Sequence, residues 1–126
     1  MKKLHLPTII SVCLLLMMAS CSKHNEASRM LTMAQQCVET SPDTALIHLD
    51  SIFMPEKFLK KDRYMEYLVT KVQAKYKNYD DIKEDTNIFI TKAYFDKKTR
   101  GSKYQMYSHL YSACVYDERG EYENAM

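Results

Sequence analysis

Apolar residues recur every three or four positions through most of this chain. One such stripe runs from Glu26 to Val38, and a second begins after Pro42 and closes before Pro55. This spacing is typical of one face of an α-helix, and Ser41 with Pro42 suits the first positions of the second helix. Two helices joined by so short a turn form an antiparallel pair, so the pattern predicts a helix pair over residues 26–53.

Three further stripes continue the pattern over about residues 60–79, 86–97 and 102–118. Asp85 or Thr86 can cap the second of these helices, and Ser102 with Gln105 fits a capping box for the third. A sixth helix begins at Glu121 and is cut off by the end of the chain. We therefore expect about five helices, arranged as antiparallel pairs, and the start of a sixth.

Few residues interrupt these helices. The chain of 126 residues has two glycines and three prolines, which leaves little room for the turns of a many-stranded sheet. The fold class predicted from the sequence is all-α.

The first 20 residues differ from the rest. Lys2 and Lys3 precede an apolar run over residues 9–19, and small residues follow, as in a secretory signal. The run is short for a membrane span, which needs about 20 apolar residues. Its end, Met18-Ala19-Ser20-Cys21, resembles the lipobox of bacterial lipoproteins, although leucine is usual where methionine stands here.

The lipobox resemblance implies that residues 1–20 are removed and that the Cys21 thiol carries a thioether-linked diacylglycerol. Membrane attachment would then be through N-terminal acyl chains, with residues 21–25 as an acylated polar tether and residues 26–126 as the folded domain. The absence of Asp after Cys21 resembles lipoproteins sent to the outer membrane, on a face that the sequence does not specify. An ordinary secretory signal or an uncleaved anchor helix is the alternative.

Charge and cysteine content exclude several classes of function. Without Lys2 and Lys3 the chain has sixteen basic and sixteen acidic residues, so no basic surface for nucleic acid is predicted. Cys37 and Cys114 lie within apolar helical stripes and are expected as buried free thiols, although an exported compartment also permits a disulfide between them. No motif for a metal, a cofactor or a catalytic nucleophile occurs, so neither a cofactor nor an enzymatic activity is predicted.

The helix pairs also repeat. Ala34, Ala74 and Ala113 occupy similar places in the first helix of each pair and are separated by 40 and 39 residues. Self-similarity at such a period indicates a helical-repeat protein.

The last segment, "ACVYDERGEYENA", resembles the middle of a tetratricopeptide repeat (TPR). In that family a small residue, a tyrosine three positions later, Gly-x-Tyr at the turn and an alanine in the second helix form the pattern. The family's Trp and Leu are replaced by His109 and Ser112. The resemblance implies a TPR-like α-solenoid over residues 26–126, and the residues that match the motif are Ala113, Tyr116, Gly120, Tyr122 and Ala125.

A TPR buries its first helix against its own second helix and against the next repeat. Six residues after Gly120 cannot supply that cover, so Leu110, Tyr111 and Cys114 are expected to stay partly exposed. The expectation is that the chain is the N-terminal portion of a longer protein.

The function that these features imply is a membrane-anchored interaction scaffold of the bacterial cell envelope, with a protein or peptide partner in a concave groove. Ten tyrosines, all between residues 64 and 122, supply core contacts or the groove wall. One alternative is a carbohydrate-capture lipoprotein of the outer membrane, whose glycan would stack on these rings. Another is the sensor part of a longer regulator.

Overall fold

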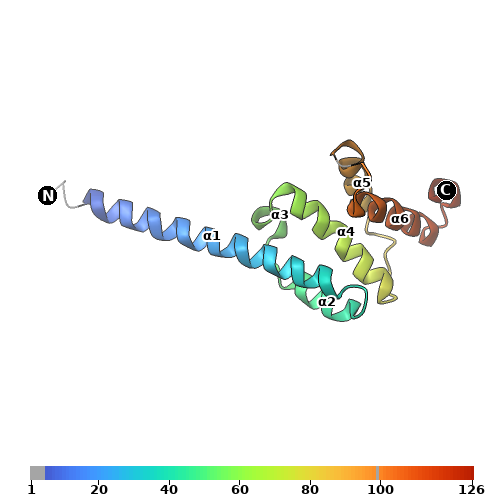
Figure 1. Ribbon diagram of the computed structural model, residues 1–126, viewed down its shortest axis with the longest axis horizontal. Coiled ribbons are helices and arrows are strands. Elements are labelled where there is room, and N and C mark those ends of the chain that lie inside the picture. Colours follow the sequence, from blue (N-terminus) through green and yellow to red (C-terminus); the bar gives the residue numbers. More distant parts are fainter. Residues whose placement is uncertain (1–4, 99) are drawn as a thin grey trace.

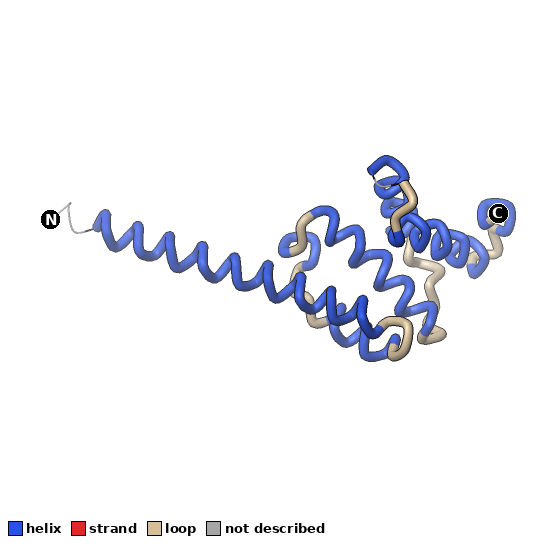
Figure 2. The backbone as a smooth tube through the Cα atoms, viewed as in Figure 1, coloured by secondary structure: helices blue, strands red, loops and turns tan. Residues whose placement is uncertain are grey.

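The computed structural model describes residues 5–98 and 100–126, and these residues form an all-α protein (Figure 1). No strand occurs within the described ranges, as Figure 2 shows. The helices are α1 (His5–Cys37), α2 (Pro42–Asp50), α3 (Pro55–Phe58), α4 (Lys61–Lys77), α5 (Asn87–Lys98), α6 (Lys103–Glu118) and α7 (Tyr122–Ala125). The predicted fold class is confirmed.

Consecutive long helices pack on one another in the order of the chain. The C-terminal half of α1 packs on α2, α2 on α4, α4 on α5, and α5 on α6. In addition, α4 contacts both α1 and α6, so the three helices that begin the predicted pairs lie side by side, with α4 between α1 and α6. Helix α4 is therefore the centre of the fold, with three helices before it and three after it among the described residues.

Helix α1 is longer than the sequence pattern predicts. The apolar N-terminal segment and the first predicted helix form one continuous helix, and the expected tether of residues 21–25 is helical (Figure 1). The reason is that no proline or glycine lies between Pro7 and Pro42 to interrupt it. Residues 5–26 are exposed, and the first buried side chain is that of Ala27.

The core lies between α1, α2, α4, α5 and α6. Its largest fully buried apolar side chains are Leu31, Leu49, Val69, Ile82, Ile88 and Val115. Most of these residues belong to the apolar stripes, although Ile82 comes from the polar loop before α5. Of the three residues expected to stay partly exposed, Leu110 and Cys114 do, but Tyr111 is buried because it faces α4.

The helix caps follow the prediction in part. Pro42 is the first residue of α2, but the Ser41 side chain makes no capping hydrogen bond. Ser102 Oγ accepts from Gln105 N at 3.1 Å, as a capping box requires. The Gln105 side chain accepts from Gly101 N at 2.6 Å, one residue before the expected donor. Asp85 Oδ2 accepts from Lys75 Nζ of α4 at 2.5 Å.

Helix α3 and the turn before it were not predicted. The pattern extends the second helix to residue 53, but α2 ends at Asp50 and a turn leads to the single helical turn of α3. Within this turn Met54 has φ +44° and ψ +64°, the left-handed conformation that residues with a side chain rarely adopt. The bend leaves Phe53 exposed while Phe58 is buried against α1.

One arginine connects α4 to α1. The Arg63 guanidinium donates to Gln35 Oε1 at 3.1 Å, to the Ser28 carbonyl at 3.1 Å and to Thr32 Oγ1 at 2.8 Å, all on α1. It also pairs with Glu66 of its own helix at 2.7 Å. A planar guanidinium with five N–H groups can serve several acceptors at once, which a lysine ammonium cannot do in this geometry.

The substitution Arg63→Ala should lower the free energy of unfolding by about 1–3 kcal/mol, because three acceptors on α1 lose their hydrogen-bond donor. The measurement is urea unfolding of the full chain in mild detergent, followed by far-UV circular dichroism. Arg29→Ala is the matched control, since Arg29 is exposed and its hydrogen bond, to Met33, stays within α1. Equal shifts of the two midpoints would contradict the bridging role.

Candidate functional site

A second polar bridge joins α1 to α4 at the opposite end of their contact. Glu39, just after α1, accepts from Gln73 Nε2 at 2.5 Å and pairs with Lys77 Nζ at 2.7 Å. The hydrogen bond from Lys77 lowers the pKa of the Glu39 carboxyl below its ordinary value, although burial opposes this. The Arg63 and Glu39 bridges hold α1 and α4 side by side. Helix α6 packs against another side of α4.

Aromatic rings fill the boundary between α4 and α6. Tyr107 and Tyr111 of α6 have ring centroids 6.1 Å apart, and Tyr111 meets Tyr76 of α4 edge-on at 5.9 Å. The row continues to Tyr104, whose ring lies 6.4 Å from that of Tyr107 and 6.1 Å from that of Phe95 of α5. Edge-to-face and offset pairs at such distances are favourable beyond the area they bury.

The rings of the row differ in exposure. Tyr111 is 3% exposed, Tyr104 and Tyr107 are half-buried, and Tyr76 is 44% exposed. Burial raises the pKa of Tyr104 to about 12 and also raises the pKa of Tyr111, so both phenols stay neutral at physiological pH. Tyr76 is the most exposed ring of the row.

A hollow of about 610 Å³ opens at this exposed end. We call it the tyrosine groove, and its lining residues are Glu39, Pro42, Tyr76, Lys77, Tyr79, Asp80 and Glu118. They come from the α1–α2 turn, the C-terminal end of α4 and the C-terminal end of α6. Each of the three side-by-side helices or its following turn therefore contributes to one groove.

Tyr79 projects into solvent at this groove from a strained backbone. It has φ +61° and is 98% exposed. The Asp80 N–H donates to the Lys75 carbonyl at 2.9 Å and the Tyr79 N–H to the Tyr76 carbonyl at 3.1 Å, which is a Schellman motif. Glycine is the usual residue at the left-handed position of this motif. A strained tyrosine with an uncovered ring makes this position a candidate binding residue.

The residues that match the TPR motif lie around the corresponding turn after α6. Gly120 has φ +74°, and the Glu121 N–H reaches back to the Tyr116 carbonyl at 2.8 Å, so the expected left-handed glycine is present. The Tyr116 ring stacks on Phe89 of α5 with centroids 4.4 Å apart. Ala113 is half-buried, as is Ala125 of α7, whereas Tyr122 is exposed. None of these five residues lines the tyrosine groove.

The predicted lipidation residue lies far from this groove along the chain. Cys21 is exposed on α1, six residues before the first buried side chain. Cys37 and Cys114 are half-buried free thiols, on α1 and α6. Over residues 5–98 and 100–126 no three His, Cys, Asp or Glu side chains gather closely enough to hold a metal ion.

Sequence reasoning missed Tyr79 and the groove around it. The tyrosine lies at the end of an apolar stripe, where the pattern does not distinguish a core ring from an exposed one. The one available indication was its position directly after a helix and before a polar cluster, where a glycine would be expected.

Comparison of the chain with protein-family models, with curated proteins and with solved structures found no match.

The substitution Tyr79→Gly should raise the free energy of unfolding by about 1 kcal/mol, because glycine adopts the left-handed conformation without strain. Tyr79→Ala is the control, since alanine also lacks the ring but keeps the strained Cβ. Urea unfolding of the full chain in detergent compares the two. A Tyr79→Gly chain no more stable than Tyr79→Ala would show that the conformation carries no strain.

The stability of the fold should fall as pH rises from about 10 to 12. The phenol of an unfolded tyrosine ionises near its ordinary pKa of 10.0, whereas folded Tyr104 ionises near 12. Between these values the unfolded chain binds fewer protons than the folded one, so alkaline pH favours unfolding. Thermal midpoints across this range measure the effect, and Tyr104→Phe should reduce their slope. If Tyr104→Phe left the slope of thermal midpoint against pH unchanged, the Tyr104 hydroxyl would be solvated and would not contribute to the loss of stability.

Proposed function

We propose that this protein is a membrane-anchored, TPR-type interaction scaffold of the bacterial cell envelope, with a protein segment as the partner of its tyrosine groove. The observation that carries the proposal is the continuity of α1. One helix joins an exposed apolar segment to the face on which α1, α4 and α6 lie side by side.

The anchor is assigned to Cys21, and the apolar part of α1 before it is assigned as the signal segment that directs the chain to the membrane. Its apolar residues are exposed, and the helix is long and apolar enough to cross a membrane, a property that signal sequences near an N-terminus share. Small residues directly before exposed Cys21 suit cleavage by a signal peptidase and acylation of the Cys21 thiol. Two or three acyl chains would hold the protein stably at the bilayer, with the outer membrane as the proposed location.

The order of helix packing supports the TPR-type scaffold. In a TPR array the first helix of each repeat packs on its own second helix and on the next repeat. Here α1 packs on α2 and α4, and α4 packs on α5 and α6. Helix α3 is an addition between the first two pairs, and it lies beside α1 and the start of α4, away from the groove-lining residues.

The composition of the groove favours a segment with basic and apolar side chains. Three carboxylates line it, from Glu39, Asp80 and Glu118, against one ammonium, that of Lys77. Lys77 already pairs with Glu39. The rings of Tyr76 and Tyr79 offer apolar contact and one polar atom each, a combination that is frequent at protein interfaces.

The test uses the full chain in the envelope of living bacteria. A photo-crosslinking amino acid is placed at position 76 in the groove and, as the matched control, at position 47, because Ile47 is also exposed but lies on α2 outside the groove. Cells are grown with an alkyne-labelled fatty acid. We expect fatty-acid labelling that Cys21→Ser abolishes, together with a discrete protein crosslink from position 76 and none from position 47.

Each half of the proposal can fail separately. Labelling that persists in Cys21→Ser would contradict the lipid anchor. Equal crosslinking from both positions, or retention by immobilised glycans that Tyr76→Ala and Tyr79→Ala abolish, would contradict the protein-binding groove and favour carbohydrate capture.

A further inference from the structure

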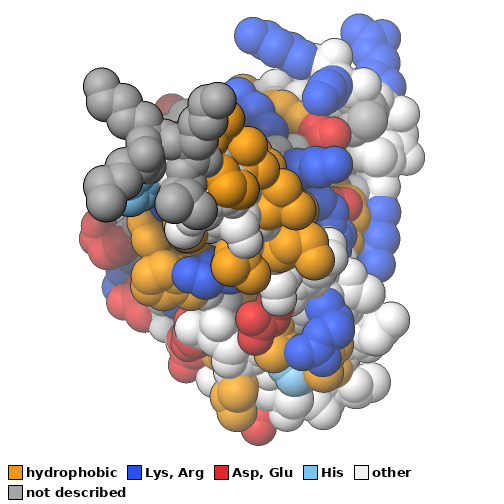
Figure 3. Space-filling view, turned by 90° about the vertical axis from the view of Figure 1, so that its left-hand side faces the viewer, with side chains coloured by type: hydrophobic (Ala, Val, Ile, Leu, Met, Phe, Trp, Pro, Cys, Tyr) orange, Lys and Arg blue, Asp and Glu red, His pale blue; other side chains and the backbone are white. Residues whose placement is uncertain are grey.

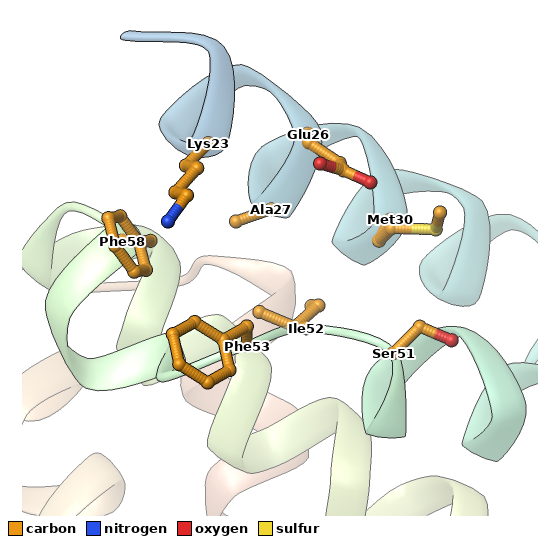
Figure 4. A pocket seen from close by; sticks show the side chains of 8 residues that line it. All are labelled: Lys23, Glu26, Ala27, Met30, Ser51, Ile52, Phe53 and Phe58. Carbon is orange, nitrogen blue, oxygen red and sulfur yellow. The ribbon is translucent and has the colours of Figure 1, made fainter. Parts of the chain in front are cut away.

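A second exposed region lies at the opposite end of α4, where α1 leaves the folded domain. A hollow of about 350 Å³ separates α1 from the turn before α3, and Figure 4 shows its lining residues. The Phe53 and Phe58 rings stack with centroids 6.2 Å apart. Lys23 of α1 extends toward both rings in Figure 4, with its Nζ 5.8 Å and 5.6 Å from their centroids.

This region is joined rigidly to the anchor segment. His24 Nδ1 donates to the Phe58 carbonyl at 2.6 Å, and its ring meets the Phe58 ring edge-on. The helix continues without interruption from these residues to Cys21 and to the apolar segment before it. At a rise of 1.5 Å per residue, Cys21 and Lys23 are only about 3 Å apart along the helix axis. Cys21 and the residues of α1 that contact Phe53 and Phe58 therefore lie on one helix, with no loop between them.

The side chains that face outward here suit the boundary of a bilayer. Phe53 is 67% exposed, and Met54 beside it is held outward by its left-handed backbone. Lys23 lies over both phenylalanine rings, Lys57 lies over the Phe58 ring, and Lys60 lines a neighbouring hollow with His24 and Phe58. None of these three lysines makes an ion pair within the part of the chain that the structure describes. Glu26 and Glu56 are the nearby acidic residues on the same segments.

Figure 3 shows the molecule from the side on which the N-terminal part of α1 projects. Apolar side chains gather in the middle of this view, beside the grey N-terminal residues, and Lys and Arg side chains lie at its top and right-hand edge. Apolar rings among lysines are the combination by which proteins lie on anionic lipid surfaces, the rings entering the headgroup region and the lysines facing phosphates.

We propose that Phe53 and Met54, together with Lys23 and Lys57 at the phenylalanine rings and Lys60 on the other side of Phe58, form a membrane-contact surface that lies against the anionic phospholipid headgroups next to the anchor. The region, called here the Phe53 surface, fixes the orientation of the domain. Because the tyrosine groove lies at the other end of α4, it points away from the bilayer toward its partner. The inference rests on the membrane attachment in the proposed function, but it holds equally for an acylated Cys21 and for an uncleaved spanning helix.

The sequence offers a direct probe, because the chain contains no tryptophan. Phe53→Trp places a single fluorophore in the Phe53 surface with little change of shape. Tyr79→Trp is the matched control, an exposed aromatic position at the far end of α4. Each full-length variant is reconstituted into vesicles of phosphatidylethanolamine and phosphatidylglycerol, with or without brominated acyl chains, and flotation establishes that it is bound.

We expect the Phe53→Trp emission to shift to shorter wavelength in vesicles and to be quenched by brominated lipid, while Tyr79→Trp keeps the emission of a water-exposed indole. Adding Lys57→Glu and Lys60→Glu should weaken the quenching on these anionic vesicles but not on vesicles of phosphatidylcholine. Circular dichroism in detergent confirms that each variant keeps its helix content.

Three results would overturn the inference. Equal, unquenched emission from both positions in floated vesicles would show that the domain stands clear of the bilayer, and the anchor would remain valid. A blue-shifted Phe53→Trp emission that brominated lipid does not quench would show that a second protein copy covers the surface. Failure of the full chain to float with the vesicles would contradict both the membrane anchor and the contact of the Phe53 surface with lipid.

Discussion

The burial of Ala27, Leu31 and Ala34 against the neighbouring helices is the contact on which the rest of this structure depends. These side chains are 0–5% exposed, and two of them are alanines, which let α1 approach α2 and α4 closely. The same helix carries the uncovered apolar residues before Cys21. One continuous helix therefore belongs to the folded domain at its C-terminal half and carries, at its N-terminal half, a segment long and apolar enough to cross a membrane.

Residues with a strained backbone lie toward both ends of α4. Gly101 and Gly120 adopt positive φ without cost, but Met54 and Tyr79 adopt it with a side chain. Each strained residue leaves an aromatic ring in solvent, that of Phe53 in one case and that of Tyr79 itself in the other. Neither exposed ring contributes to the core. The coincidence of a strained backbone with an exposed aromatic ring, at both ends of α4, is the physical basis for proposing the tyrosine groove and the Phe53 surface.

The helices themselves could be predicted because their signals are local. Apolar spacing placed α4, α5 and α6 close to their observed positions, and Pro42, Ser102 and Gly120 lie at helix ends for reasons that single residues carry. The errors occurred where local signals are weak. Residues 21–25 are polar yet helical, since nothing interrupts α1, and α3 is one turn long, too short for any periodicity to be recognised.

The sequence by itself determined the all-α class, the number of long helices and the candidate anchor at Cys21, because these follow from composition and from spacings within a few residues. Only the tertiary structure decided which rings are open to a ligand. Tyr111 and Tyr79 look alike in the sequence, but one is buried against α4 and the other is exposed. Tyr111 meets Tyr76 of α4, 35 positions earlier in the chain. Helical periodicity carries no information over that distance, nor over the similar separations at which Arg63 bonds Thr32 and Gln73 bonds Glu39.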